Sequence, residues 1–160
     1  MNEPKLVPSS AGRAYSVVGD RYAVKVSGED TGGAYALFDF FVPVGNGPPP
    51  HLHTREDEGF WITEGELAFY LGAEQRRVVA RAGDYVHAAR GVPHSFRNEG
   101  TVPARAVVQV VPAGLERFFA EVGDELPDAQ SPPTPPGPEQ IGKLLAAAPR
   151  YGLEIMKPAR

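Results

Sequence analysis

The sequence predicts an all-β protein, an antiparallel sandwich or barrel that carries short helices at its C-terminal end. Two observations predict this class. The chain has 18 Gly and 17 Pro among 160 residues, and the segments between them are short runs rich in Val, Tyr, Phe and Trp. After Val111, the apolar residues recur at the spacing of a helix instead.

The predicted strands are short, and each is bounded by residues that favour turns. In chain order they are Ala14–Val18, Tyr22–Val26, Tyr35–Val42, Phe60–Thr63, Glu66–Leu71, Arg76–Ala80, Tyr85–Ala88, His94–Arg97 and Ala104–Val111. Between two of them, Gly65 provides a residue that tolerates the positive φ of a tight hairpin turn. Short strands at such regular spacing are typical of antiparallel sandwiches and barrels.

The C-terminal part is predicted to be helical. Apolar residues recur at helical spacing in two segments, Leu115, Phe118, Phe119 and Val122, then Ile141, Leu144, Leu145 and Ala148. Gly123 stands where the residue after a helix end is expected, and Pro138 where a second helix begins. Between the helices, the six prolines in residues 127–138 predict an extended linker that cannot join a sheet.

We therefore divide the chain into three parts. Residues 1–34 are N-terminal strands that pack on or extend the barrel, residues 35–111 form the barrel, and residues 112–160 form a helical appendage with the Pro-rich linker 127–138. The two N-terminal strands, Tyr15–Val18 and Tyr22–Val26, are expected at an edge of the sheet, and unpaired strand edges invite association. The sequence leaves open whether the C-terminal helix packs on its own barrel or on a neighbour.

Composition limits the chemistry available to the protein. The chain has no Cys and only four His, which excludes disulfides, zinc–thiolate sites, iron–sulfur clusters and a cysteine nucleophile. A net charge of −4 gives no electrostatic reason to bind nucleic acid or a membrane surface. The N-terminal residues do not resemble a signal peptide, and no apolar run is long enough to span a membrane. We expect a cytoplasmic protein whose partner is a small-molecule substrate.

Three of the four histidines are placed to share a metal with one carboxylate. His51 and His53 are two residues apart, so on an extended backbone both imidazoles point to the same side. Glu58 begins a strand whose inward face is apolar, and a buried carboxylate there needs a compensating charge. His94 begins a later strand directly after a turn. Together they offer three nitrogens and one oxygen to a divalent transition metal, with positions left open for substrate or oxygen.

These segments resemble the two motifs of the cupin superfamily. The first motif is matched at every position, by Gly45, His51, His53, Glu58 and Gly65. The second is matched by Gly83, Gly91, His94 and Asn98, with Ala89 where the family has Pro. The resemblance covers about Tyr35 to Val111 and implies a jelly-roll β-barrel with a metal, namely Fe, Mn, Ni, Co, Cu or Zn. Residues 112–119 and 151–155 also resemble small bacterial cupins of the quercetin-dioxygenase-like type. Small cupin barrels of this kind commonly dimerise through their N-terminal strands, so the resemblance implies a homodimer.

Other polar and aromatic residues near the motifs have a simpler interpretation. His87 lies in the middle of a predicted strand and is interpreted as structural or outward-facing rather than as a fifth ligand. Glu56 and Asp57 are interpreted as solvated loop acids, and Arg55 as a surface residue rather than a guide for an anionic substrate. Trp61 alternates away from the inward residues of its strand, which favours outer packing or a dimer contact.

Two polar residues within apolar strands have two interpretations each. Asp39 either faces the interior, as a substrate-binding or ligand-supporting residue, or is exposed near a hairpin. Gln109 is either a pocket residue or an outward one. The register of the strands does not decide either case.

The resemblance favours a metal-dependent dioxygenase acting on a small aromatic or enolisable substrate. In such an enzyme, His51, His53 and His94 hold the metal, and Glu58 is a ligand that also removes the substrate proton. The alternatives are a redox-neutral isomerase or lyase, in which the metal polarises a carbonyl, and a non-catalytic binding, storage or structural cupin. The mostly apolar strands disfavour a very polar substrate such as a sugar phosphate.

Overall fold

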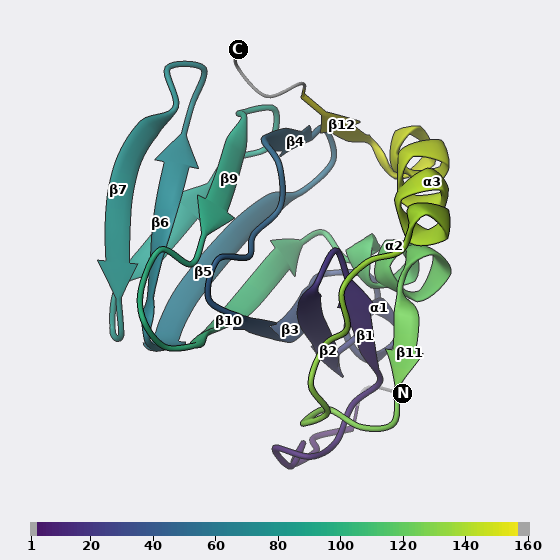
Figure 1. Cartoon of the computed structure of the whole chain (residues 1–160). Coiled ribbons are helices and arrows are strands. Elements are labelled where there is room, and N and C mark those ends of the chain that lie inside the picture. The colour runs from purple at the N-terminus through teal and green to yellow at the C-terminus, as the bar shows by residue number, and fades with distance from the viewer. Residues whose placement is uncertain (1–2, 157–160) are drawn as a thin grey trace.

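The computed structural model describes residues 3–156, and within them the strands form two facing antiparallel sheets (Figure 1). The larger sheet has seven strands in the order β11 (Asp124–Leu126), β1 (Ala14–Val17), β2 (Asp20–Val26), β3 (Ala36–Val42), β10 (Ala104–Val111), β5 (Asp57–Glu64) and β8 (Tyr85–Ala88). The smaller has five, in the order β12 (Leu153–Ile155), β4 (His51–His53), β9 (His94–Arg97), β6 (Glu66–Leu71) and β7 (Arg76–Arg81). The helical elements are α1 (Gly28–Thr31), α2 (Leu115–Val122), α3 (Pro138–Ala147) and the 3-10 turn η1 (Ala148–Tyr151).

This architecture confirms the predicted all-β fold with short C-terminal helices. The predicted hairpin glycine, Gly65, has φ 68°, and a Cβ there would lie 2.7 Å from the carbonyl oxygen of Pro103. The prediction did not include β11 and β12, which are three residues long and pair with the distant strands β1 and β4. So short a segment carries no periodicity, which is why the local sequence does not reveal it.

The interior between the sheets is aromatic. Phe60 of β5 lies across from the smaller sheet, with its ring 5.2 Å from that of Phe69 and 5.6 Å from that of Phe96. Phe38 and Phe40 of β3 point into the same core and are at most 3% exposed. Burying rings of this size supplies a large share of the hydrophobic stabilisation of a small barrel.

Asp39 lies on the opposite face of β3, outside the core. Its carboxylate accepts a hydrogen bond of 2.6 Å from Arg105 on the neighbouring strand β10, and the residue is only 7% exposed. Asp39 therefore neither lines the interior nor stands free in solvent. The register did not reveal this, because the ion pair depends on which strand lies next to β3.

Helix α2 packs against its own barrel through its apolar face. Leu115, Phe118, Phe119 and Val122 are all buried, as their spacing predicts. The ring of Phe119 stacks on Tyr22 of β2 at 4.3 Å. Gly123 ends the helix in an extended conformation with φ −83°, not in the left-handed one, because β11 begins at the next residue.

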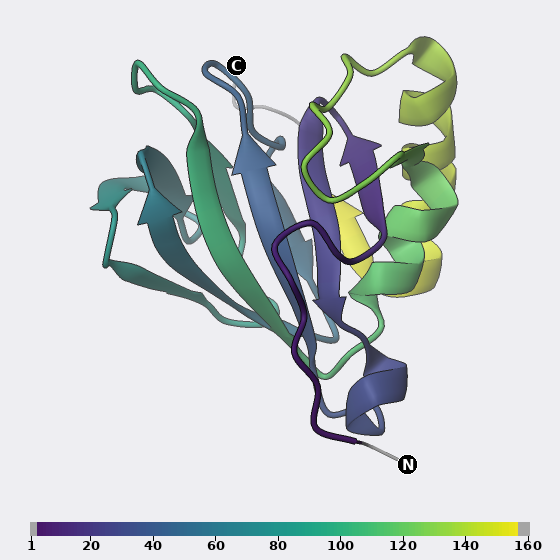
Figure 2. The ribbon, with the colours of Figure 1, turned by 90° about the horizontal axis from the view of Figure 1, so that it is seen from below.

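The Pro-rich segment 127–137 is an extended strap that lies along β1 and β2 (Figure 2). Arg21 donates a hydrogen bond of 2.8 Å to the carbonyl oxygen of Ser131, and Ser16 and Thr134 bond to each other. Beyond the strap, the buried Gln140 of α3 donates to the carbonyl oxygen of Ser16. These contacts place α3 on its own barrel, which answers the question that the sequence left open.

The pairing of strand β1 bears on the predicted association. Strand β1 is paired on one side with β2 and on the other with β11 of the same chain, so both of its edges are occupied. The predicted homodimer stays a prediction.

Within residues 3–156, no helix combines the length and the apolar character needed to cross a membrane.

Asp20, at the turn between β1 and β2, is a buried carboxyl with incomplete hydrogen bonding. It is 1% exposed, its Oδ1 accepts a hydrogen bond of 3.2 Å from Asn46, and its Oδ2 has no partner within residues 3–156. Burial raises the pKa of Asp20 from 3.8 to about 7, although the hydrogen bond from Asn46 acts to lower it. The folded protein therefore holds a proton here that the unfolded chain releases between these two pH values.

We predict that Asp20→Asn removes a pH dependence of stability. Because the folded state binds the extra proton, the free energy of unfolding of the native protein falls as pH rises from about 4 to 7, by about 1–4 kcal/mol. Asparagine keeps an oxygen that can accept the hydrogen bond from Asn46, and it carries no charge. The free energy of unfolding of Asp20→Asn should therefore increase relative to that of the native protein as pH rises from about 4 to 7. Urea unfolding of both proteins at pH 4, 6 and 8 measures this. A stability difference that does not change with pH would contradict the assignment to Asp20.

Candidate metal centre

The structure brings together all four residues predicted to hold a metal. His51, His53, Glu58 and His94 each place one ligand atom within 4.8 Å of the others. The three histidines come from the smaller sheet, where His51 of β4 pairs directly with His94 of β9. Glu58 comes from β5 of the larger sheet. The cluster therefore joins the two sheets across the interior, and each sheet fixes its own part of it.

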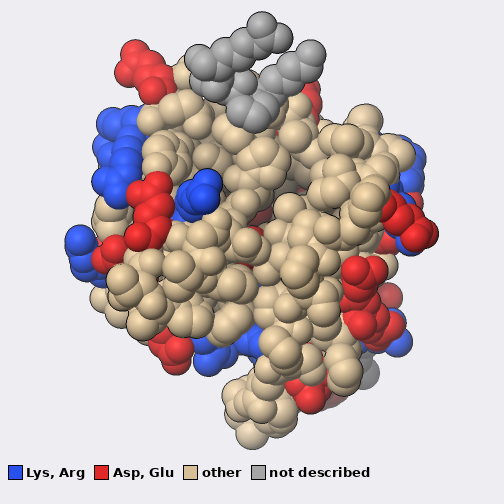
Figure 3. Space-filling model, in the orientation of Figure 1, with Lys and Arg blue, Asp and Glu red and all other residues tan. Residues whose placement is uncertain are grey.

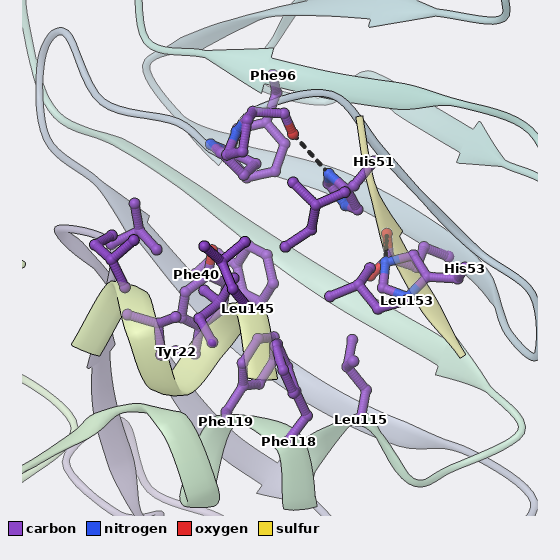
Figure 4. Close-up of a pocket in the computed structure, with 18 of the residues that line it drawn as sticks. Tyr22, Phe40, His51, His53, Phe96, Leu115, Phe118, Phe119, Leu145 and Leu153 are labelled. Atoms are coloured by element: carbon purple, nitrogen blue, oxygen red, sulfur yellow. Dashed lines mark hydrogen bonds and ion pairs between the residues drawn. The ribbon is translucent and has the colours of Figure 1, made fainter. Parts of the chain in front are cut away.

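The three imidazoles direct the same ring nitrogen, Nε2, toward the centre of the cluster. The Glu58 Oε2 atom lies 2.8 Å from His94 Nε2 and 3.4 Å from His53 Nε2. His51 uses its other nitrogen, Nδ1, for a hydrogen bond of 2.9 Å with the carbonyl oxygen of Pro49 (Figure 4). As a carbonyl only accepts, Nδ1 carries the proton and Nε2 of His51 is left with a free lone pair. This is the tautomer that a metal ligand requires.

The electrostatics of the cluster suit a cation. Burial lowers the pKa of His51 to about 3, with help from His94 and His53, so His51 is neutral at physiological pH. Burial alone would raise the pKa of Glu58, but His53 and His94 together hold it well below its usual value. For His53 burial acts to lower the pKa, and the carboxylates of Glu58 and Glu56 raise it nonetheless.

A divalent metal fits this donor set. Three imidazoles and one carboxylate, with the carboxylate and two of the imidazoles at most 4% exposed, offer nitrogen and oxygen ligands within one coordination sphere. A buried carboxylate needs a compensating positive charge, and a divalent cation held by the three imidazoles supplies one. We conclude that the cluster is positioned to bind a divalent transition metal, as predicted. The choice among Fe, Mn, Ni, Co, Cu and Zn is not determined by these ligands.

Three residues of the cluster, His51, His53 and Glu58, form one wall of a cavity of about 160 Å³. The remaining walls are apolar, and six aromatic rings contribute to them: Tyr22, Phe40, Phe60, Phe96, Phe118 and Phe119 (Figure 4). Ile141, Leu144 and Leu145 of α3 line the side away from the sheets. Within residues 3–156, no Lys or Arg side chain lines the cavity. Across the face drawn in Figure 3, most of the Lys, Arg, Asp and Glu atoms lie toward the margins, and the middle is mostly formed by other residues.

Four further residues lie away from the metal cluster. His87, Gln109 and Trp61 are exposed on the outer face of the larger sheet, and Trp61 is 57% exposed. His87 is thus an outward-facing histidine, and Gln109 is not a pocket residue. Arg55 is exposed, in agreement with its interpretation as a surface residue. Trp61 faces outward as its alternation predicts, and its part in a dimer contact stays a prediction.

Glu56 corrects the sequence interpretation. A solvated loop acid was expected, but the side chain is only 4% exposed, and its Oε2 lies 3.6 Å from His53 Nδ1. Burial raises the pKa of Glu56, against the opposing effect of His53. The loop after β4 turns inward, which the local sequence does not reveal. Asp57, by contrast, binds Arg90 at the surface.

Comparison with known proteins places this site in a family. Residues 38–125, more than half of the chain, match the model of the Cupin domain. The quercetin 2,3-dioxygenase of Bacillus subtilis (strain 168) is 23% identical over 143 residues, which cover 89% of this chain and 41% of the relative. The chain thus spans less than half the length of that relative.

Solved structures show the same fold at low sequence identity. A polyketide cyclase from Streptomyces resistomycificus superposes with a TM-score of 0.61 at 17% identity, covering 86% of this chain and 90% of that one. A predicted oxalate decarboxylase from Thermotoga maritima gives 0.59 at 23% identity, covering 68% and 99%. With the family model matched and both motifs assembled around one cluster, the chain belongs to the cupin family.

Proposed function

We propose that the protein is a metal-dependent dioxygenase that acts on a small aromatic or enolisable substrate. One observation carries the proposal: the metal cluster opens on a cavity whose other walls are apolar and aromatic. Such walls favour a flat, apolar molecule that presents a single oxygen to the metal. The similarity to a quercetin 2,3-dioxygenase supports this choice of chemistry, although at 23% identity it does not identify the substrate.

The size and polarity of the cavity narrow the substrate class. A volume of about 160 Å³ is close to that of protein cavities of about 150 Å³ that hold benzene, so a single ring fits without rearrangement. A flavonol has three rings and requires Leu144 and Leu145 of α3 to move. Sugar phosphates are disfavoured, because none of the described residues that line the cavity offers a cationic side chain to their phosphate group.

Glu58 is the residue suited to remove a proton from the substrate. Its carboxylate is ionised at neutral pH, because His53 and His94 hold its pKa low against the effect of burial. Turning away from these histidines toward the cavity would make it a stronger base. A redox-capable metal bound at the site would supply coordination for the substrate oxygen and electron exchange with dioxygen. The apolar walls meanwhile exclude water from the reacting oxygen.

Oxygen uptake by metal-loaded protein tests the proposal. The protein should be purified without an affinity tag, loaded separately with Fe, Mn, Co, Ni, Cu or Zn, and assayed with single-ring diketones, catechols and flavonols. We predict oxygen uptake with at least one redox-capable metal and none with Zn. We further predict a larger kcat/KM for single-ring substrates than for flavonols, because the larger substrates must displace α3.

The alternatives are distinguished by the same assay. Turnover of a keto acid or sugar with Zn, and no oxygen uptake with any metal, would replace the dioxygenase by a redox-neutral lyase or isomerase. Tight binding of a small aromatic compound without turnover would leave a non-catalytic binding protein. Either result would contradict the proposed reaction without affecting the metal site itself.

A further inference from the structure

The buried carboxylate of Glu56 has no role in the proposed reaction. It lies 3.6 Å from His53 Nδ1, which is within ion-pair range but too long for a hydrogen bond. Within residues 3–156, neither Glu56 Oε2 nor His53 Nδ1 has a hydrogen-bond partner. The nearby Arg90 binds Asp57 instead, through its backbone N–H and its guanidinium group. Unpaired buried atoms are rare in proteins, and two that face each other indicate an interaction that is not yet complete.

Metal binding would complete this interaction. When a metal takes the lone pair of an imidazole Nε2, the proton must reside on Nδ1, and that N–H then needs an acceptor. His51 has one in the carbonyl oxygen of Pro49 at 2.9 Å, and His94 lies 3.4 Å from the carbonyl oxygen of Val92. Among residues 3–156, no backbone carbonyl accepts from His53 Nδ1, and Glu56 Oε2 is the acceptor that faces this atom.

The net charge of the buried site also favours a role for Glu56 in metal binding. A divalent cation held by three neutral imidazoles and the Glu58 carboxylate leaves one positive charge in a buried site. The Glu56 carboxylate, adjacent to a ligand but not itself one, cancels that charge. Burying a neutral assembly costs less than burying a charged one.

We propose that Glu56 is a positioning residue for the metal: its carboxylate accepts the His53 Nδ1 proton, fixes the orientation of that imidazole and raises metal affinity. The proposal rests on metal binding at the cluster and does not depend on the dioxygenase reaction. Its test therefore measures metal binding and ligand spectroscopy, which separates its failure from failure of the proposed activity.

The test compares Co²⁺ affinity in three variants by competition with a chromophoric chelator. Glu56→Leu removes both the acceptor and the charge, and we expect the dissociation constant to rise by about 10- to 100-fold. Glu56→Gln keeps a side-chain oxygen as acceptor, so its affinity for Co²⁺ should fall less than that of Glu56→Leu. Asp57→Asn is the matched control, since it removes one charge from the adjacent acid, and should change affinity by no more than about twofold. Thermal melts of the metal-free proteins establish that each variant is folded.

Spectroscopy distinguishes positioning from general stability. In the proton NMR spectrum of the native protein loaded with Zn²⁺, the His53 Nδ1–H resonance should appear at the low field typical of a hydrogen bond to a carboxylate. This resonance should shift in Glu56→Gln and stay in place in Asp57→Asn. The visible bands of bound Co²⁺ should follow the same pattern. Native affinity and spectra in Glu56→Leu would overturn the proposal, as would equal losses in Glu56→Leu and Asp57→Asn. If Glu56→Leu does not fold, Glu56→Gln, which preserves side-chain shape, decides between the same outcomes.

Discussion

The His94→Ala protein is expected to lose nearly all of its bound metal while the barrel stays folded. His94 supplies one of three imidazoles, and its Nε2 atom is the closest of them to Glu58, at 2.8 Å. Substituting a residue that merely supports a ligand costs about 10- to 100-fold in metal affinity, so removal of a ligand should cost more than about 100-fold. Isothermal titration of the metal-free protein with Co²⁺ or Ni²⁺ measures the loss.

His87→Ala is the matched control for this experiment. It also replaces a histidine by alanine in a strand close to the motif, but His87 is exposed on the outer face of the larger sheet. We expect native metal affinity in this variant and a melting temperature close to that of the native protein. Full metal occupancy in His94→Ala would remove His94 from the site, and loss of the metal in His87→Ala would show that the cluster is assigned wrongly.

Glu58→Gln should have the largest effect on turnover. The substitution preserves the shape of the side chain and an oxygen that can still face the metal, but it removes the carboxylate that we propose as acceptor of the substrate proton. General-base catalysis contributes about 10²- to 10⁴-fold, so kcat per bound metal should fall by that factor. The measurement is oxygen uptake at saturating substrate, divided by the metal content of the same sample.

Metal content separates the two roles of Glu58. Metal affinity should also decrease in Glu58→Gln, because a neutral amide is a weaker ligand than a carboxylate, but saturating metal should restore occupancy. Restored occupancy with turnover still low supports the assignment of Glu58 as the base. Native turnover per bound metal would rule out that role and leave Glu58 as a ligand alone.

The metal residues could be predicted because the motifs are local. His51 and His53 share a side through the geometry of a strand, and Glu58 and His94 lie at or next to the first residue of a strand, at the spacing of the family motifs. The all-β fold was likewise predictable from short strands bounded by Gly and Pro. These features need only neighbouring residues, and neighbouring residues are what a single sequence displays.

Features that depend on distant segments could not be predicted. Asp39 is paired with Arg105, which lies 66 residues further along the chain. Glu56 is buried because the loop after β4 turns inward, and no local pattern reports the direction of a loop. The cavity wall from Leu144 and Leu145 depends on the strap, which carries α3 back over the barrel. The apolar spacing identified that helix but not the surface that it covers.

The measurement that tests the central claim most directly is the metal content of protein purified without an affinity tag. Elemental analysis should be combined with titration of the metal-free form, using native protein and His94→Ala side by side. We predict about one divalent transition metal per native chain and almost none in the variant. A native protein that carries no metal, and binds none when Fe, Mn, Co, Ni, Cu or Zn is added, would contradict the account of the cluster.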